Sequence, residues 1–214
     1  MPSKSIKRLL TKCMPRFIES IKLLDGKYLN LRYHEERMYN TLWQVTGVKP
    51  TQTLIQLLDL ELRPSRGLYK CRVVYSEDRH YVEYVPYTMK PVGSLKLVKN
   101  DAIDYKYKFE NRTELNEMFN QRGACDDVII AKNGFVTDAS YANLLLKFGN
   151  DWVTPTTCLF NGVMRQCLLA EGKIQEDEIR VNDLIRFDSV KLINALLGME
   201  GNEVPINKIF FDAK

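Results

Sequence analysis

The spacing of apolar residues changes partway along the chain, and this change constrains the fold more than any other feature. From residue 33 to residue 62, apolar side chains recur every three or four positions, which is typical of helices that bury one face. From residue 68 to residue 98 the spacing becomes two, the period of a half-buried strand. A chain that carries both periods in separate regions is predicted to be an α+β protein.

Turn residues divide the chain into short elements. Asp25-Gly26 and Asn133-Gly134 tolerate positive φ angles, so each pair is expected to close a tight hairpin. Gly47 is expected to end the first helix. The predicted strands are 17–24, 28–31, 68–76, 80–89, 94–98, 127–131, 135–137, 143–148, 152–154, 174–179, 190–194 and 204–211, and the predicted helices are 33–46, 53–62, 111–120, 162–172 and 182–187.

The length of 214 residues suits one large domain or two small ones. We expect a basic, disordered leader over residues 1–16, because its lysines and arginines cluster without an apolar pattern. An N-terminal α+β domain is then expected over 17–100, a linker over 101–107 and a C-terminal domain over 108–214.

Composition argues against several classes of protein. The chain is 45% hydrophobic and 27% charged, as ordinary globular proteins are, and no apolar run is long enough to span a membrane. Five cysteines without a Cys-x-x-Cys pair argue against a disulfide scaffold or a zinc site and favour the cytoplasm. With only His34 and His80, a histidine metal centre or Ser-His-Asp triad has little support. We therefore expect no metal, nucleic-acid or membrane partner.

Several short segments could bind a charged ligand, although each is also explained by an ordinary turn or surface charge. Lys108 lies among aromatic residues just before a predicted helix, and Arg37 near the start of another has the planar geometry that matches phosphate. Asp138 ends a predicted strand, where a carboxylate can hold a protonated ring nitrogen. Asn161-Gly162 opens a helix whose first amides would form an anion site.

The order and spacing of these segments resemble the fold-type IV pyridoxal-phosphate enzymes (class IV aminotransferases), and most closely the 4-amino-4-deoxychorismate lyases. The resemblance runs from about residue 17 to residue 206. The segments that carry it are Glu19-Ser-Ile-Lys22, His34-Glu-Glu-Arg37, Lys108-Phe-Glu-Asn-Arg-Thr-Glu114, Val136-Thr-Asp138 followed by Asn143-Leu144, Asn161-Gly-Val-Met-Arg-Gln166 and Asn194-Ala-Leu196. They are similar to the family's Glu-Thr-Ile-Arg, His-x-x-Arg, Lys-x-Leu-Asn-Arg-x-Glu, Val-Thr-Glu with Asn-Leu, Asn-Gly-Ile-Met-Arg-Gln and Asn-Ala-Leu.

The resemblance implies a two-domain, D-amino-acid aminotransferase-like fold, with a small N-terminal α/β sandwich and a larger C-terminal α+β pseudo-barrel. It also implies a homodimer and the cofactor pyridoxal 5'-phosphate, held by the catalytic residue Lys108 as a Schiff base. Arg37 would bind the cofactor phosphate and Asp138 its ring nitrogen. The other cofactor-binding residues would be Asn143, Gly162, Val163, Met164, Asn194 and Ala195, with Lys22 and Tyr107 facing the substrate.

Two departures from the family accompany this resemblance. Asp138 replaces a glutamate and is one methylene shorter, and the stretch before Phe17 does not resemble the family's N-terminal strand, which predicts an altered dimer. The expected reaction converts the small amino substrate 4-amino-4-deoxychorismate to 4-aminobenzoate and pyruvate, a step of folate biosynthesis. The alternatives are an aminotransferase for D-alanine or branched-chain amino acids, and a cofactor-free structural or binding homologue.

Overall fold

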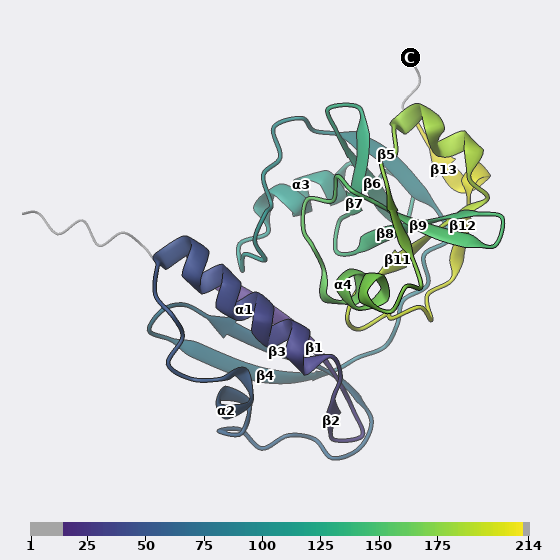
Figure 1. Cartoon of the computed structure of the whole chain (residues 1–214). Helices are drawn as coiled ribbons and strands as arrows, with labels where there is room; N and C mark the ends of the chain where they lie inside the picture. Colours follow the sequence, from purple (N-terminus) through teal and green to yellow (C-terminus); the bar gives the residue numbers. More distant parts are fainter. Residues whose placement is uncertain (1–14, 212–214) are drawn as a thin grey trace, which may run out of the picture.

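Two β-sheets organise the molecule. The structure is a computed structural model that describes residues 15–211, so nearly all of the predicted leader lies outside the described residues (Figure 1). One sheet has four strands in the order β2-β1-β3-β4. The other has nine, with a path β10-β9-β8-β7-β6-β5-β13 that β11 and β12 join through β8. In the described part of the chain, no helix is both long and apolar enough to cross a membrane. This mixed architecture confirms the predicted α+β class.

The four-stranded sheet buries one face beneath two helices. Figure 1 shows α1 lying along this sheet. Phe17, Ile21 and Leu23 recur at every second or fourth position of β1, so they share one face and enter the same apolar cluster as Met38 and Leu58. The elements of this region are β1 (Phe17–Leu24), β2 (Lys27–Tyr28), α1 (Leu31–Thr46), α2 (Leu54–Leu58), β3 (Leu68–Tyr75) and β4 (His80–Pro86).

The nine-stranded sheet carries the larger core. Its central strands read as nearly continuous apolar runs because both of their faces are covered, and Leu144, Leu145 and Leu146 of β8 are all fully buried. The strands are β5 (Leu95–Lys99), β6 (Asp127–Lys132), β7 (Phe135–Ala139), β8 (Asn143–Phe148), β9 (Asp151–Pro155), β10 (Gln175–Asp177), β11 (Ser189–Ile193), β12 (Glu203–Pro205) and β13 (Ile209–Phe210). The helices are α3 (Thr113–Asn120), α4 (Val163–Ala170) and two 3-10 turns, η1 (Val181–Arg186) and η2 (Ile206–Lys208).

The predicted hairpin turns are confirmed. Asp25 and Gly26 both have positive φ, 46° and 76°, between β1 and β2. Asn133 and Gly134, at 52° and 83°, connect β6 to β7 in the same way. Both central residues of such a turn need positive φ, which is why these pairs could be recognised from their residue types alone.

A backbone bridge joins β1 to the segment that precedes α3. The amide of Ile18 donates to the carbonyl of Lys108 at 2.9 Å, and Phe17 forms an antiparallel bridge with Phe109. The fully buried ring of Phe17 also packs on the rings of Tyr75 and Phe109, at centroid distances of 5.7 and 5.3 Å. The segment around Lys108 is therefore held directly against the four-stranded sheet.

Three expectations about single elements are wrong. The strand predicted at 94–98 was expected in the first region, but β5 pairs in parallel with β6 and β13 of the larger sheet. The helix predicted at 53–62 ends at Leu58. The strand predicted at 204–211 is interrupted by η2 immediately after Pro205, a residue that has no backbone N–H for a sheet. The placement of β5 bears on where the first unit ends, and the division into domains stays a prediction.

Replacing Phe17 with alanine is expected to lower the free energy of unfolding by about 3–5 kcal/mol, because a buried aromatic ring is lost at the bridge. Urea unfolding of the full chain would measure the change. Phe148→Ala is the matched control, since that side chain is 57% exposed and should lose much less. Equal losses in the two variants would contradict this account of the bridge.

Candidate active site

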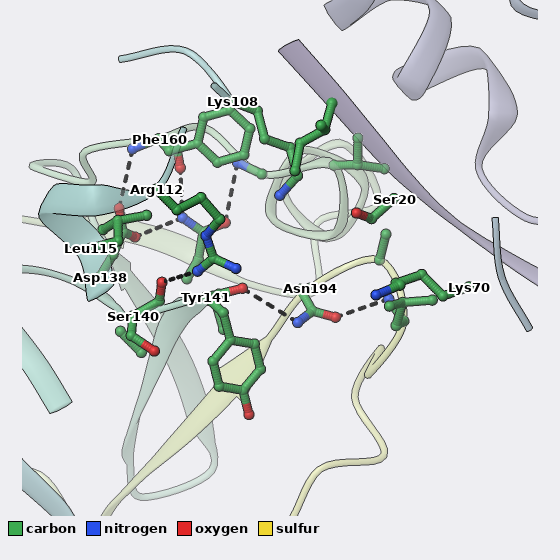
Figure 2. Close-up of a pocket in the computed structure, with 18 of the residues that line it drawn as sticks. Ser20, Lys70, Lys108, Arg112, Leu115, Asp138, Ser140, Tyr141, Phe160 and Asn194 are labelled. Carbon is green, nitrogen blue, oxygen red and sulfur yellow. Dashed lines mark hydrogen bonds between the residues drawn. The ribbon is translucent and has the colours of Figure 1, made fainter. Parts of the chain in front are cut away.

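A cavity of about 350 Å³ is lined by residues from both sheets. Ile18, Ser20 and Lys70 come from the four-stranded sheet and Arg37 from α1, whereas the rest of the wall comes from residues 87–196. Figure 2 shows the side chains that surround it. The cavity brings together eight of the residues singled out in the sequence: Arg37, Lys108, Asp138, Asn143, Gly162, Val163, Asn194 and Ala195.

Three predicted site residues do not line the cavity. Lys22 is nearly buried and its Nζ lies 3.4 Å from the Glu200 carboxylate. The hydroxyl of Tyr107 donates to Gln44 at 3.0 Å. Met164 packs its side chain against a separate apolar cluster beneath α4. The substrate-facing roles proposed for Lys22 and Tyr107 therefore have no support from their positions, whereas the packing of the Met164 side chain does not bear on its backbone amide.

The amine of Lys108 has an unusual environment. Burial, followed by the nearby charge of Arg37, lowers its pKa from 10.5 to about 7. Its Nζ lies 5.2 Å from the centre of the Phe160 ring. The sequence placed Lys108 among aromatic residues but did not single out Phe160, whose ring is the one in contact. Near neutral pH much of the amine is uncharged, the form that acts as a nucleophile or base.

Asp138 lies in the cavity wall as a buried carboxylate bound only by neutral donors. Its Oδ2 accepts from the backbone amides of Leu159 and Phe160 at 2.8 and 3.1 Å, and its Oδ1 accepts from Asn143 Nδ2 at 2.7 Å. Burial outweighs these hydrogen bonds and raises the pKa from 3.8 to about 7. A cationic N–H placed beside Asp138 would favour its ionised form.

Asn143 connects Asp138 to the start of α4. Besides donating to Asp138, its Nδ2 donates to the carbonyl of Phe160 at 2.7 Å, and its Oδ1 accepts from the amide of Gly162 at 3.1 Å. A Cβ on Gly162 would lie 2.2 Å from Asn143 Oδ1, so only glycine allows this approach. The side chain thereby fixes the position of the first turn of α4, whose leading residue Val163 also lines the cavity.

Arg37 reaches the cavity from α1. Its guanidinium lies over the Phe160 ring, 4.8 Å from the centroid, and donates to the buried carboxylate of Glu19. Sequence reasoning used Glu19 only as part of a motif and missed it as a member of the site.

Sequence reasoning also missed the positive charge of the wall. Arg112, Lys70 and Lys90 line the cavity, and among the lining residues Asp138 is the single acid. The Arg112 guanidinium donates to the carbonyl of Ser140 at 2.7 Å, and Figure 2 shows Arg112 and Lys70 on opposite sides of Asn194. Arg112 belonged to the lysine motif and was a detectable candidate. Lys70 had no local signal, because its position depends on the pairing of β3 with β1.

The arrangement can bind an anion, hold a cationic ring and move a proton. Arg37 offers its remaining guanidinium donors, Asp138 offers an acceptor for a charged N–H, and Lys108 offers an amine that titrates near neutral pH. Within residues 15–211, no group of three or more histidine, cysteine or acidic side chains is placed to hold a metal ion.

Gly162→Ala is expected to destabilise the protein by about 1–3 kcal/mol, because the added methyl must displace Asn143. Urea unfolding would report the loss. Gly93→Ala is the matched control, since the nearest atom to its added Cβ is a side-chain oxygen at an ordinary 3.6 Å. The explanation fails if Gly93→Ala is as damaging as Gly162→Ala.

In the ligand-free protein, the combined contribution of Asp138 and Lys108 to the free energy of unfolding is expected to pass through a minimum near pH 7. In the folded protein Asp138 keeps its proton up to about pH 7, whereas an ordinary carboxyl has a pKa of 3.8. Between these two pH values, the contribution of Asp138 therefore lowers the free energy of unfolding as pH rises. In the folded protein Lys108 loses its proton near pH 7, whereas an ordinary lysine has a pKa of 10.5. Above pH 7, the contribution of Lys108 therefore raises the free energy of unfolding as pH rises. Each slope has a ceiling of about 1.4 kcal/mol per pH unit.

Urea unfolding at several pH values from roughly 5 to 9 would measure both slopes, which span the interval between ordinary and shifted pKa values. Asp138→Asn should flatten the acidic side only, and Lys108→Met the alkaline side only. Profiles that keep their shape in both variants would show that other groups control the pH dependence.

Comparison with known proteins identifies the family to which this chain is similar. The model of the family described as amino-transferase class IV matches residues 94–204. An uncharacterized protein of Haemophilus influenzae is 37% identical over 183 residues, which span 85% of this chain and 97% of that protein.

Solved structures agree with this match. A proposed 4-amino-4-deoxychorismate lyase from Haemophilus somnus is 32% identical, with a TM-score of 0.81 over 86% of this chain and 97% of that one. A hypothetical aminotransferase from Mycobacterium tuberculosis, solved with bound pyridoxal phosphate, is 15% identical, with a TM-score of 0.72 over 98% of this chain and 86% of that one, and shows a shared fold. Together the matches show that this chain belongs to the class IV aminotransferase family.

Proposed function

We propose that this chain binds pyridoxal 5'-phosphate in the cavity and acts as a lyase that converts 4-amino-4-deoxychorismate to 4-aminobenzoate and pyruvate. The observation that carries the proposal is the convergence of Lys108, Asp138 and Arg37 on one cavity from three distant parts of the chain. The similar Haemophilus somnus protein is a proposed lyase of this kind, and similar proteins of Mycobacterium tuberculosis and Brucella abortus were solved with pyridoxal phosphate.

The residues present fit this cofactor. Asp138 accepts only neutral donors and has a raised pKa, so a protonated pyridine nitrogen would supply the missing positive charge. Arg37 and the amides at the start of α4, from Val163 onward, would bind the phosphate, together with the backbone near Asn194. Lys108 would reach the aldehyde carbon with an amine that is largely neutral near pH 7.

Each residue would then have a definite task. Bound pyridoxal phosphate would supply an electron sink for the carbon next to the substrate amine. Lys108, with an amine that is largely neutral near pH 7, would take the proton from that neighbouring carbon as a general base. Asp138 would keep the ring nitrogen protonated, which strengthens the electron sink. The electron pair left by that proton would expel the enolpyruvyl ether oxygen from the substrate ring, which becomes aromatic, and the departing enol would take up a proton to give pyruvate.

The charge of the wall favours the lyase over an aminotransferase for simple amino acids. 4-Amino-4-deoxychorismate carries two carboxylates, whereas D-alanine and branched-chain amino acids carry one. Arg112, Lys70 and Lys90 supply positive charge to the cavity besides Arg37. The string Asn161–Gln166, which resembles the lyases closely, supports the same choice.

The cellular setting is also part of the proposal. A lyase of this kind would contribute to folate biosynthesis in the cytoplasm, and the family resemblance supports a homodimer. The proposed N-terminal unit would supply one wall of the cavity through Arg37 and Lys70, and the proposed C-terminal unit most of the other wall.

The full chain is expected to develop an absorbance band near roughly 400–430 nm when pyridoxal phosphate is added, and then to form 4-aminobenzoate and pyruvate from 4-amino-4-deoxychorismate. Lys108→Ala should abolish the band and lower turnover by about 100- to 10,000-fold, because a general base is removed. Lys106→Ala is the matched control, since this exposed lysine is two residues away and does not line the cavity.

Other outcomes would change the proposal. Amino transfer from D-alanine or a branched-chain amino acid to a keto acid, without any aromatic product, would replace the lyase with an aminotransferase. The absence of an absorbance band at any cofactor concentration would favour the cofactor-free homologue. Equal losses in Lys106→Ala and Lys108→Ala would refute the assignment of Lys108.

A further inference from the structure

Glu19 is a fully buried carboxylate at the edge of the proposed phosphate site. It lies on β1 and does not line the cavity itself. Its Oε1 accepts from Arg37 Nε at 2.9 Å, and its Oε2 accepts from the same guanidinium through Nη2. Its Oε2 also lies 2.7 Å from Nδ1 of His34, three residues before Arg37 on α1. The Glu19 carboxylate therefore contacts two side chains of α1, those of His34 and Arg37.

The charges of this group are well defined. Burial alone would raise the pKa of Glu19, but the charge of Arg37 and the hydrogen bonds from His34 and Arg37 outweigh it and bring the pKa to about 2. Burial lowers the pKa of His34, which favours the neutral ring. A neutral His34 must then donate its Nδ1 hydrogen to the Glu19 anion, while its Nε2 has no hydrogen-bond partner among the described residues.

The contacts of Arg37 leave part of its guanidinium for a ligand. Glu19 occupies Nε and one terminal nitrogen on one edge of the plane. Phe160 covers a face of the plane, with its ring centre 4.8 Å from the central carbon. The remaining N–H donors belong to a side chain that lines the cavity. A guanidinium held on one edge and one face has little freedom to turn away from the cavity.

We propose that Glu19 is a positioning residue, which holds the Arg37 guanidinium in its anion-binding orientation before a ligand arrives and is itself held by His34. The identity of the anion as the phosphate of pyridoxal phosphate rests on the proposed function. An arginine that is already ordered loses less side-chain entropy when the phosphate binds, so Glu19 would increase affinity without touching the ligand.

A purely structural role makes a different prediction. If Glu19 only neutralised a buried cation, its loss would weaken the fold and would lower the affinity of every ligand in the cavity alike. If Glu19 acts through Arg37, its loss should matter only for ligands that carry the phosphate. Pyridoxal, which has the same ring and aldehyde but no phosphate, separates the two roles.

The test measures the dissociation constants of pyridoxal phosphate and pyridoxal for the full chain and four variants by spectroscopic titration. The variants are Glu19→Gln, Arg37→Gln, the double variant and Glu83→Gln. Glu83 is the matched control, because it also accepts from an arginine, Arg72, but lies outside the cavity lining. Thermal unfolding of each variant accompanies the titrations.

Glu19→Gln should weaken pyridoxal phosphate binding at least about tenfold, equivalent to about 1.4 kcal/mol, and leave pyridoxal binding unchanged. In the Arg37→Gln background it should have no further effect, since a residue that acts through Arg37 cannot add to its loss. Glu83→Gln should change neither constant.

Equal weakening of both ligands by Glu19→Gln, or full additivity with Arg37→Gln, would overturn the positioning role. A loss in Arg37→Gln with none in Glu19→Gln would overturn this inference alone and leave the proposed function intact. Failure of the native chain to bind pyridoxal phosphate would overturn both. If Glu19→Gln does not fold, Glu19→Asp replaces it, because this variant keeps the charge but withdraws the carboxylate by one methylene. Glu19→Asp should also weaken the binding of pyridoxal phosphate and not that of pyridoxal. Equal weakening of the two ligands would refute the positioning role.

Discussion

The backbone bridge between β1 and the segment around Lys108 determines the geometry of the site. The amide of Ile18 binds the carbonyl of Lys108, and the amide of Glu110 binds the carbonyl of Arg16, so the lysine is held at the edge of the four-stranded sheet. The larger sheet then closes the cavity from the other side with β7, β8 and the loop before α4. Without this bridge, Lys108 would lie on a free connection, and neither its burial nor its distance from Arg37 would be fixed.

Burial changes the pKa values of two ionisable groups in the cavity: it lowers the pKa of Lys108 and raises the pKa of Asp138. Lys108 and Asp138 are each shifted toward the neutral form, so both titrate near pH 7 when no ligand is bound. Glu19 behaves differently, because direct pairing with Arg37 lowers its pKa and keeps its carboxylate ionised. The site therefore combines a permanent ion pair at one end with two groups whose protonation a charged ligand could decide. This division suits a ligand that has an anionic group at one end and a basic ring nitrogen at the other.

Local chemistry explains what the sequence could predict, and pairing between distant segments explains what it could not. Asn133-Gly134 lies between two apolar runs, where the pair strongly favours a tight turn, and the apolar spacing of residues 33–46 predicts α1 to within two residues. The partners of β5 and the exposure of Lys70 to the cavity depend on strands far away in the chain. Glu19 was equally hidden, because an acid in an apolar strand gives no sign of which cation it meets.

The hydrogen bonds of Asn143 have a consequence for protein engineering. Both oxygens of the Asp138 carboxylate already accept hydrogen bonds, from Asn143 and from the amides of Leu159 and Phe160. Replacing Asp138 with the glutamate of the family pattern is therefore more than a local change, since the extra methylene would move the carboxylate away from these donors, and Asn143 also accepts from the amide of Gly162. The short acid and its amide neighbour form one interlocked module, and a designer would have to exchange them together.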